Sequence, residues 1–171
     1  NSLIVATQGR SIWMLDDLTV IHQLSSSIDE EKLYKPKDSY RMRGAGGRKS
    51  LTAGTNLPNG VIIHYFLPNY NDESDEVNLS IHSSDGELIK EFSNKSKENS
   101  IKVKKGGNSF VWDMKYPGAK RLDNMVLWGA DFSGAKTVPG DYIVKLSVND
   151  SELTQDFTIH KDPTSEGSIE D

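Results

Sequence analysis

The sequence predicts an all-β protein whose main part is an antiparallel β-sandwich of about seven strands. Apolar and polar residues alternate along segments such as Val77–Ile81, which is typical of a strand with one buried face. Turn signals such as Asp85-Gly86 separate these segments, because an Asp-Gly pair tolerates the positive φ of a tight hairpin turn. The alternating segments also follow one another at short intervals, as the strands of a sandwich do.

The first segment, Leu3–Leu15, predicts a β-hairpin. Its two apolar runs, L-I-V-A and S-I-W-M-L, are too short for helices, and Gly9 supplies the turn between them. Asp16-Asp17 ends the second strand, and a short apolar segment, Leu18–Leu24, follows. Because a lone two-stranded hairpin is marginal in water, we expect it to pack on the later domain or on a body outside this chain, or to exchange with a neighbouring chain.

Residues 25–55 are predicted to form a linker. Ser25–Ser27 can cap a short helical turn over Ile28–Leu33, whose acidic residues lie near its positive end. Arg41–Thr55 is rich in glycine and basic residues and has no apolar period, which predicts a mobile loop. We therefore expect proteases to cut within Arg41–Lys49 and to leave a stable core from about Asn56.

The sandwich itself is assigned to residues 56–161, and residues 162–171 are predicted to form a disordered tail. Val61–Leu67 is a strongly apolar strand that opens the regular part, and Leu88–Phe92 is the return strand after the Asp85-Gly86 turn. The other inward-facing positions are predicted from alternation to be Val77, Leu79, Ile81, Phe110, Trp112, Met114, Tyr142, Val144, Leu146, Val148, Phe157 and Ile159.

The composition bounds the classes of partner. The 171 residues carry a formal net charge of -5 with acidic and basic residues interspersed, so attraction to nucleic acid or to an anionic membrane is not favoured. The chain has no cysteine, which excludes disulfides and thiolate metal sites. No apolar run approaches the roughly 20 residues that span a bilayer, so no membrane insertion is expected. Nothing in the sequence indicates a cofactor.

The polar residues do not form a recognisable catalytic pattern. Asp16 and Asp17 could be a carboxylate pair for glycoside hydrolysis, but adjacent strand residues point to opposite faces, so a strand-terminating turn is the favoured interpretation. The histidines at positions 22, 64, 82 and 160 stand singly, without the spacing of a zinc site. We therefore assign no catalytic or metal-binding residue. An enzyme domain remains an alternative, and it requires a pocket with two converging carboxylates.

Aromatic residues suggest one further alternative, a carbohydrate-binding module. Sugars stack on exposed aromatic rings, and Trp128 and Tyr116 lie in Gly- and Pro-containing loops where their rings could form such a platform. Trp112 and Tyr142 lie on apolar-phased strand faces and are expected in the core. Asp113, next to Trp112, could bind Ca²⁺ but is expected to accept a structural hydrogen bond.

Three motifs between Val77 and Ile159 carry a resemblance to a known module. D-G-E-L-I, G-G-N-S-F-V-W-D and P-G-D-Y-I-V-K-L resemble the Ig-like module of flagellar hook-capping proteins, which is appended to many secreted bacterial enzymes. The resemblance implies an Ig-like form of the predicted sandwich. It also implies structural roles for Asp85, Gly86, Trp112, Asp113, Gly140 and Tyr142.

The segment T-Q-G-R-S-I-W-M-L-D-D resembles the closing strands of BNR-repeat, sortilin-like β-propellers, which are often labelled glycosyl hydrolases. In that family K-P-x-D-x-Y-R and G-T-N-x-P-N-G segments follow, and here they are residues 35–41 and 54–60. Gln8 stands where the family usually has His. The resemblance implies that residues 1–24 are the last strands of a propeller, that the propeller lies upstream in the same polypeptide, and that the protein is bacterial and secreted, periplasmic or on the cell surface.

Together these observations predict a non-catalytic accessory or structural Ig-like domain at the C-terminus of a secreted propeller protein of the glycosyl hydrolase type. The alternatives are a carbohydrate-binding module, with a glycan as partner, and a cell-surface protein-interaction module. The mark of the latter is a large exposed apolar patch outside the hairpin.

Overall fold

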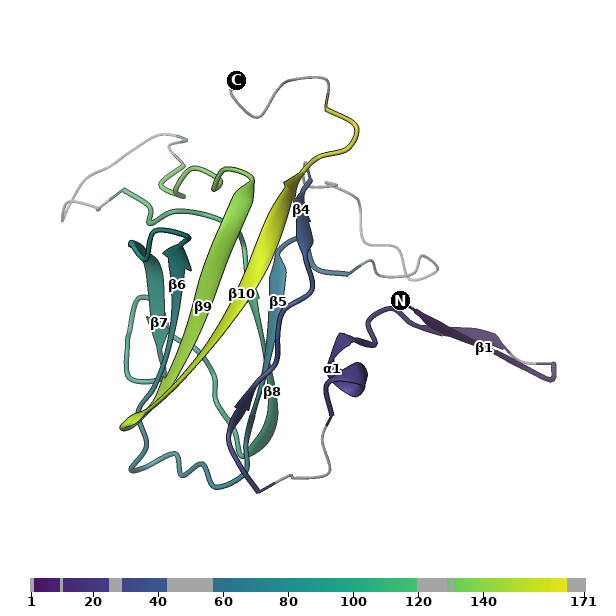
Figure 1. Ribbon diagram of the computed structural model, residues 1–171, viewed down its shortest axis with the longest axis horizontal. Coiled ribbons are helices and arrows are strands. Elements are labelled where there is room, and N and C mark those ends of the chain that lie inside the picture. Colours follow the sequence, from purple (N-terminus) through teal and green to yellow (C-terminus); the bar gives the residue numbers. More distant parts are fainter. Residues whose placement is uncertain are drawn as a thin grey trace.

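The computed structural model describes residues 2–9, 11–24, 29–42, 57–119, 129 and 131–165. Two β-sheets lie face to face in this part of the chain, and a separate β-hairpin extends to one side (Figure 1). The prediction of an all-β, sandwich-like fold is confirmed.

The larger sheet has five strands in the order β4 (Ser39–Arg41), β10 (Ser151–Lys161), β9 (Gly140–Val148), β6 (Val77–Ser83) and β7 (Leu88–Ser93). Neighbouring strands in this sheet pair antiparallel, except that β4 runs parallel to β10. The sheet is therefore mixed, and its one parallel pair joins the segment before residue 42 to the last strand.

The smaller sheet has three strands in the order β3 (Lys32–Leu33), β5 (Val61–Leu67) and β8 (Gly106–Trp112), and both pairs are antiparallel. Gly60 lets β5 begin close to β8, because a Cβ atom at this position would lie 2.3 Å from the carbonyl oxygen of Trp112. Only glycine fits there without displacing backbone.

Alternation along the strands buries one side chain in two between the sheets. Trp112 is fully buried, and its ring lies 5.9 Å from that of Tyr142 and 6.2 Å from that of Phe157, centroid to centroid. Its indole Nε1 donates a hydrogen bond to the Lys115 carbonyl at 3.3 Å, so the buried ring keeps no unpaired donor. The other buried side chains around these rings include Val61, Ile63, Tyr65, Leu67, Val77, Leu79, Ile81, Val144, Leu146 and Ile159.

The turn between β6 and β7 has the geometry that Asp85-Gly86 indicates. Gly86 adopts a φ of 86°, and its backbone N–H donates to the Ser83 carbonyl at 3.0 Å. The ladder shifts register between Ile81 and His82, so a β-bulge precedes the turn.

The structure differs from the sequence-based expectation before residue 42. Lys32–Leu33, expected to end a helical turn, form strand β3, while Ser25–Ile28 lie outside the described residues. The reason is tertiary: Leu33 is 3% exposed and pairs with Tyr65 of β5, and this burial outweighs the local preference. A short helix, α1 (Thr19–His22), appears instead within the apolar segment Leu18–Leu24.

The segment expected to be a linker, residues 25–55, therefore contributes β3 and β4 to the two sheets. Residues 43–56, which contain most of the Gly-rich basic segment and the expected boundary at Asn56, lie outside the described residues. In the expected tail, residues 162–165 form a turn in which Ser165 N–H donates to the Asp162 carbonyl, and residues 166–171 are not described.

Candidate functional site

The N-terminal hairpin consists of β1 (Leu3–Thr7) and β2 (Ser11–Leu15), which pair antiparallel in a sheet of their own. Gly9 turns the chain between them with a φ of 83°. Figure 1 shows the hairpin extending away from the sandwich, with its strands beside neither of the two larger sheets.

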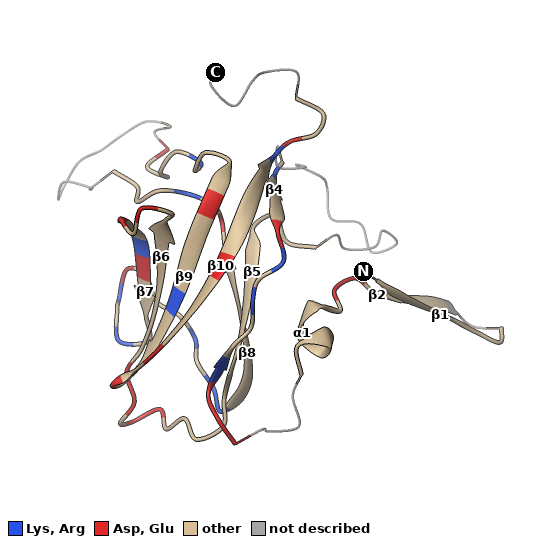
Figure 2. Ribbon diagram, in the orientation of Figure 1, with Lys and Arg blue, Asp and Glu red and all other residues tan. Residues whose placement is uncertain are grey.

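Both faces of this hairpin are apolar and exposed. The register places Leu3 opposite Leu15 and Val5 opposite Trp13 on one face, and Ile4 opposite Met14 on the other. These side chains, together with Ile12, are between 46% and 75% exposed. Figure 2 shows no charged residue in the described part of either strand, whereas the larger sheet carries charges of both signs. A strand that is apolar on both faces is typical of a sheet covered on both faces.

Asp16–Leu18 and helix α1 connect the hairpin to the sandwich. The Asp17 carboxylate accepts a hydrogen bond from the backbone N–H of Thr19 at 2.9 Å, which forms a local turn directly before the helix. At the other end, the Gln23 side chain donates to the Lys35 carbonyl at 2.9 Å and accepts from the Lys35 N–H at 2.8 Å. One amide side chain thus pairs with the Lys35 backbone as a strand would, and it joins α1 to the segment between β3 and β4.

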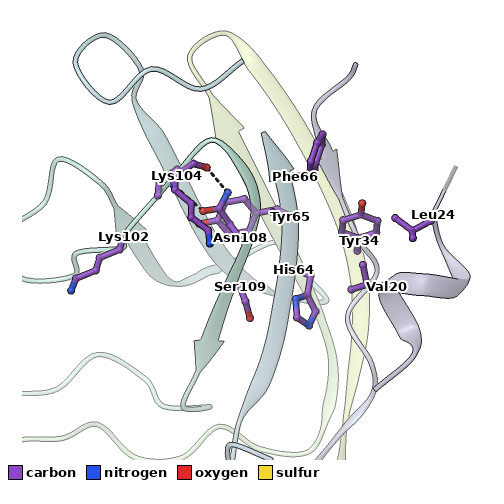
Figure 3. A pocket seen from close by; sticks show the side chains of 12 residues that line it. Val20, Leu24, Tyr34, His64, Tyr65, Phe66, Lys102, Lys104, Asn108 and Ser109 are labelled. Atoms are coloured by element: carbon purple, nitrogen blue, oxygen red, sulfur yellow. Dashed lines mark hydrogen bonds between the residues drawn. The ribbon is translucent and has the colours of Figure 1, made fainter. Parts of the chain in front are cut away.

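A groove of about 690 Å³ lies between α1 and the outer face of the smaller sheet. Figure 3 shows Val20, Leu24 and Tyr34 on one side of it, Lys102 and Lys104 on the other, and His64 and Ser109 on the neighbouring strands between them. The wall that carries the two lysines is fixed by Asn108, a buried side chain whose amide donates to the Lys104 carbonyl at 2.7 Å and accepts from its N–H at 2.9 Å.

His64 is half-buried in this groove, and burial lowers its pKa below the usual value while the charge of Asp17 partly opposes the shift. Burial tends to raise the pKa of Asp17, but the hydrogen bonds from Thr19 and the charges of Lys37 and His64 outweigh it and lower that pKa. Asp17 therefore stays ionised and His64 neutral at pH 7.

His64 lies opposite Ser109 in the β5–β8 ladder, so Asp17, His64 and Ser109 include the residue types of a hydrolytic triad. In the described residues, however, no hydrogen bond joins Ser109 to His64 or His64 to Asp17. A general base must reach the proton that it abstracts, and here the Asp17 carboxylate is instead committed to the start of α1.

A second groove, of about 460 Å³, is lined by Asp17 and by residues at and around β4. Tyr40, Met42 and Leu57 line it and are each at least 40% exposed, and Ile62 of β5 is also part of its wall. Asp38, on its rim, accepts a hydrogen bond from the Thr158 N–H at 3.2 Å and lies 3.4 Å from the His160 ring nitrogen. The first groove includes His64 and Phe66 of β5 and the second includes Ile62, so both grooves reach the outward residues of this strand.

The residues that were weighed for catalysis or sugar binding are dispersed. Asp17 lies at the start of α1, and the Asp16 carbonyl accepts a hydrogen bond from the Ser2 hydroxyl at 3.4 Å. Tyr116 is 37% exposed, but Trp128 lies outside the described residues, so the aromatic platform stays a prediction.

The residues assigned structural roles lie along the sandwich. Asp85 and Gly86 are in the β6–β7 turn, and Gly140 opens β9. The Tyr142 hydroxyl donates to the Val138 carbonyl at 2.5 Å, while Trp112 fills the core. Asp113 is exposed, with its carboxylate 4.0 Å from the Lys90 amine.

Among the described residues, no group of three His, Asp or Glu side chains is arranged to hold a metal ion. No helix in the same described residues is long and apolar enough to cross a membrane.

Sequence reasoning missed the outer face of β5 and the Gln23 anchor. A signal for the first exists: V-I-I-H-Y-F-L has apolar residues at both phases of the strand, which indicates that neither face is meant for water. No local pattern indicates the second, because Gln23 and Lys35 meet only once β3 is in place.

No family model matches the chain, and no curated protein and no solved structure matches it either.

Proposed function

We propose that this chain is a non-catalytic accessory β-sandwich whose N-terminal hairpin attaches it to a larger β-rich body. The observation that supports the proposal is the apolar character of both hairpin faces, combined with the exposure of seven large apolar side chains. Fully burying one such side chain is worth about 1.5–3 kcal/mol, so a body that covers both faces would gain a large free energy of association.

The proposed partner is a β-propeller located upstream in the same polypeptide, with this chain as an Ig-like C-terminal module of a secreted bacterial protein of the BNR-repeat type. A propeller suits the hairpin because its blades pack around a central channel, so a blade sheet has a neighbour on each face. Hairpin edges also suit such a partner, because neither strand has a charged or proline residue in its described part that would discourage pairing. Any glycosidic activity would then belong to the propeller.

The experiment compares the 171-residue chain with the full-length natural polypeptide by hydrogen–deuterium exchange. We expect the amides of Leu3–Leu15 to exchange rapidly in the 171-residue chain and at least about a hundredfold more slowly in the natural polypeptide, because a sheet would then hold both edges.

A matched pair of variants controls this comparison. In the natural polypeptide, Ile12→Asp should abolish the protection, whereas Leu88→Asp, at another exposed apolar position on β7, should leave it unchanged. Equal and rapid exchange of the hairpin in both proteins would refute the proposal.

A further inference from the structure

We infer that the outer face of the β3–β5–β8 sheet is a second contact surface for the same body that takes the hairpin, so that this body seats against the sandwich at two places. This inference rests on the proposed function. We call the surface the β5 face and define it by the two grooves that the outward residues Ile62, His64 and Phe66 of β5 line.

The β5 face differs chemically from the outer face of the larger sheet. The half-buried outward residues of β5 are Ile62, His64 and Phe66, whereas those of β6 are Asn78, Ser80 and His82. An antiparallel sheet with one face in water normally shows polar residues on that face, as β6 does. The outward residues of β5 therefore indicate a covered face.

Exposed apolar residues extend this face beyond β5. Tyr40, Met42 and Leu57 surround the second groove, and Leu24 borders the first and is 57% exposed. Exposed apolar residues that line two grooves reaching the same strand are typical of a protein-interaction surface.

The connection to the hairpin identifies the occupant. Only Asp16, Asp17 and Leu18 lie between β2 and α1, so the Cα atoms of Leu15 and Thr19 are at most about 14 Å apart even in an extended chain. Helix α1 in turn borders the first groove and is held by Gln23. A body of domain size that binds the hairpin is therefore held close to α1 and the first groove, beside the β5 face.

The charges at the border of the face specify the chemistry of its partner. Lys102 and Lys104 are both exposed on the wall of the first groove, and neither has an ion pair within the described residues. Asp17 stays ionised, but it lines the second groove and not the first, and the charges that it acts on are those of Lys37 and His64. We therefore expect the partner to present an apolar surface with carboxylates that face the two lysines.

Hydroxyl-radical footprinting of the natural polypeptide and of the 171-residue chain tests the inference. We expect oxidation of Met42 and Leu57 to fall at least about fivefold in the natural polypeptide, as for residues in an interface core. Leu88, which is also exposed but lies on β7, at the edge of the larger sheet opposite β4, should change by less than about twofold, as a surface residue outside an interface does. Acetylation of Lys102 and Lys104 should slow in the same comparison, whereas that of exposed Lys97 should not.

The outcomes separate this inference from the proposed function. Protection of Trp13 without protection of Met42 and Leu57 would overturn the inference and leave the hairpin attachment intact. Absence of protection at Trp13, Met42 and Leu57 in the natural polypeptide would overturn both the inference and the proposed hairpin attachment. Protection that appears in the 171-residue chain itself, with a doubling of mass as concentration rises, would assign the face to a second copy of this chain and would also overturn the inference.

A double variant, Met42→Glu with Leu57→Glu, provides an independent test in the natural polypeptide. Both side chains are exposed, so the sandwich should fold and melt as before. Footprinting should then show Tyr40 as reactive as in the 171-residue chain, while the hairpin amides stay protected. An unchanged footprint at Tyr40 would contradict the inference.

Discussion

The hairpin and the core of the sandwich use the same kinds of residue with opposite results. Trp112 in β8 is fully buried between two sheets, whereas Trp13 in β2 is 66% exposed. Both lie in short apolar strands paired antiparallel to a neighbour. The difference is that the strands of the sandwich find their cover within this chain and those of the hairpin do not. An apolar pattern thus indicates that a residue is to be buried, but not by which body.

Strand β5 lies between these two extremes. Its inner face is fully covered by the larger sheet, while its outer face is only partly covered by α1 and Tyr34. The degree of cover, rather than the composition of the strand, therefore separates the buried core from the surfaces that we propose for contact.

The largest effect is expected from truncation. A chain that begins at residue 57 loses β3 and β4, including the buried Leu33, and should lose about 5 kcal/mol or more of its free energy of unfolding, enough to leave it largely unfolded. A chain that begins at residue 29 keeps both strands and should stay within about 2 kcal/mol of the parent. Urea denaturation followed by circular dichroism measures both. Equal stability of the two truncated chains would mean that β3 and β4 do not stabilise the sandwich and act as a linker.

A pair of tryptophan variants breaks or sharpens the comparison directly. Trp112→Ala should cost about 3–5 kcal/mol because it leaves a cavity between the sheets. Trp13→Ala should change the free energy of unfolding of the 171-residue chain by less than about 0.5 kcal/mol, as for an exposed side chain. Chemical denaturation measures the two differences. A similar cost for both would mean that the hairpin packs on the sandwich in solution.

The Gln23 anchor should affect geometry more than stability. Gln23→Ala removes the two hydrogen bonds to the Lys35 backbone, at a cost of about 1–2 kcal/mol confined to α1. The distance distribution between spin labels on the hairpin and on β7 should broaden. Gln155→Ala, which removes the hydrogen bond from Gln155 to the Leu33 carbonyl, serves as the control and should leave that distribution unchanged. A narrow distribution in the Gln23 variant would assign the orientation of the hairpin to other contacts.

The smallest effect is a pH dependence at His64. Because burial lowers the folded-state pKa of His64 below 6.5, the unfolded chain binds the proton first, so stability falls as pH drops from 6.5 toward the folded pKa. The effect should be below about 1 kcal/mol, since the side chain is only half-buried. His64→Phe should remove this slope from the pH profile of unfolding, and Asp17→Asn should steepen it by removing the opposing charge. An unchanged slope in His64→Phe would place the titration elsewhere.

Much of the fold could be predicted from sequence, because strands such as β6 and β9 alternate regularly and each pairs with a strand that also alternates. Strands β3 and β4 could not, since two or three residues carry no period and their partners lie far along the chain. Leu33 is an example. It follows acidic residues that favour a helix start, yet its strand conformation is determined by burial against β5. Of the candidate site, the hairpin could be predicted because its pattern is local. The grooves could not, because they form only once the sheet has folded.

The parallel pairing of β4 with β10 has a mechanical consequence. Ser39 lies beside Ile159 and Arg41 beside Lys161, so a force that pulls the hairpin away from the residues after Lys161 acts along these strands in opposite directions. Such a load shears the three residue pairs together instead of peeling them apart one by one. The ion pair between Lys35 and Asp156, at 2.5 Å, bridges the same two segments further along. Tension between the proposed partner of the hairpin and the far end of the sandwich would pass through this pair of strands, after β3 with its buried Leu33.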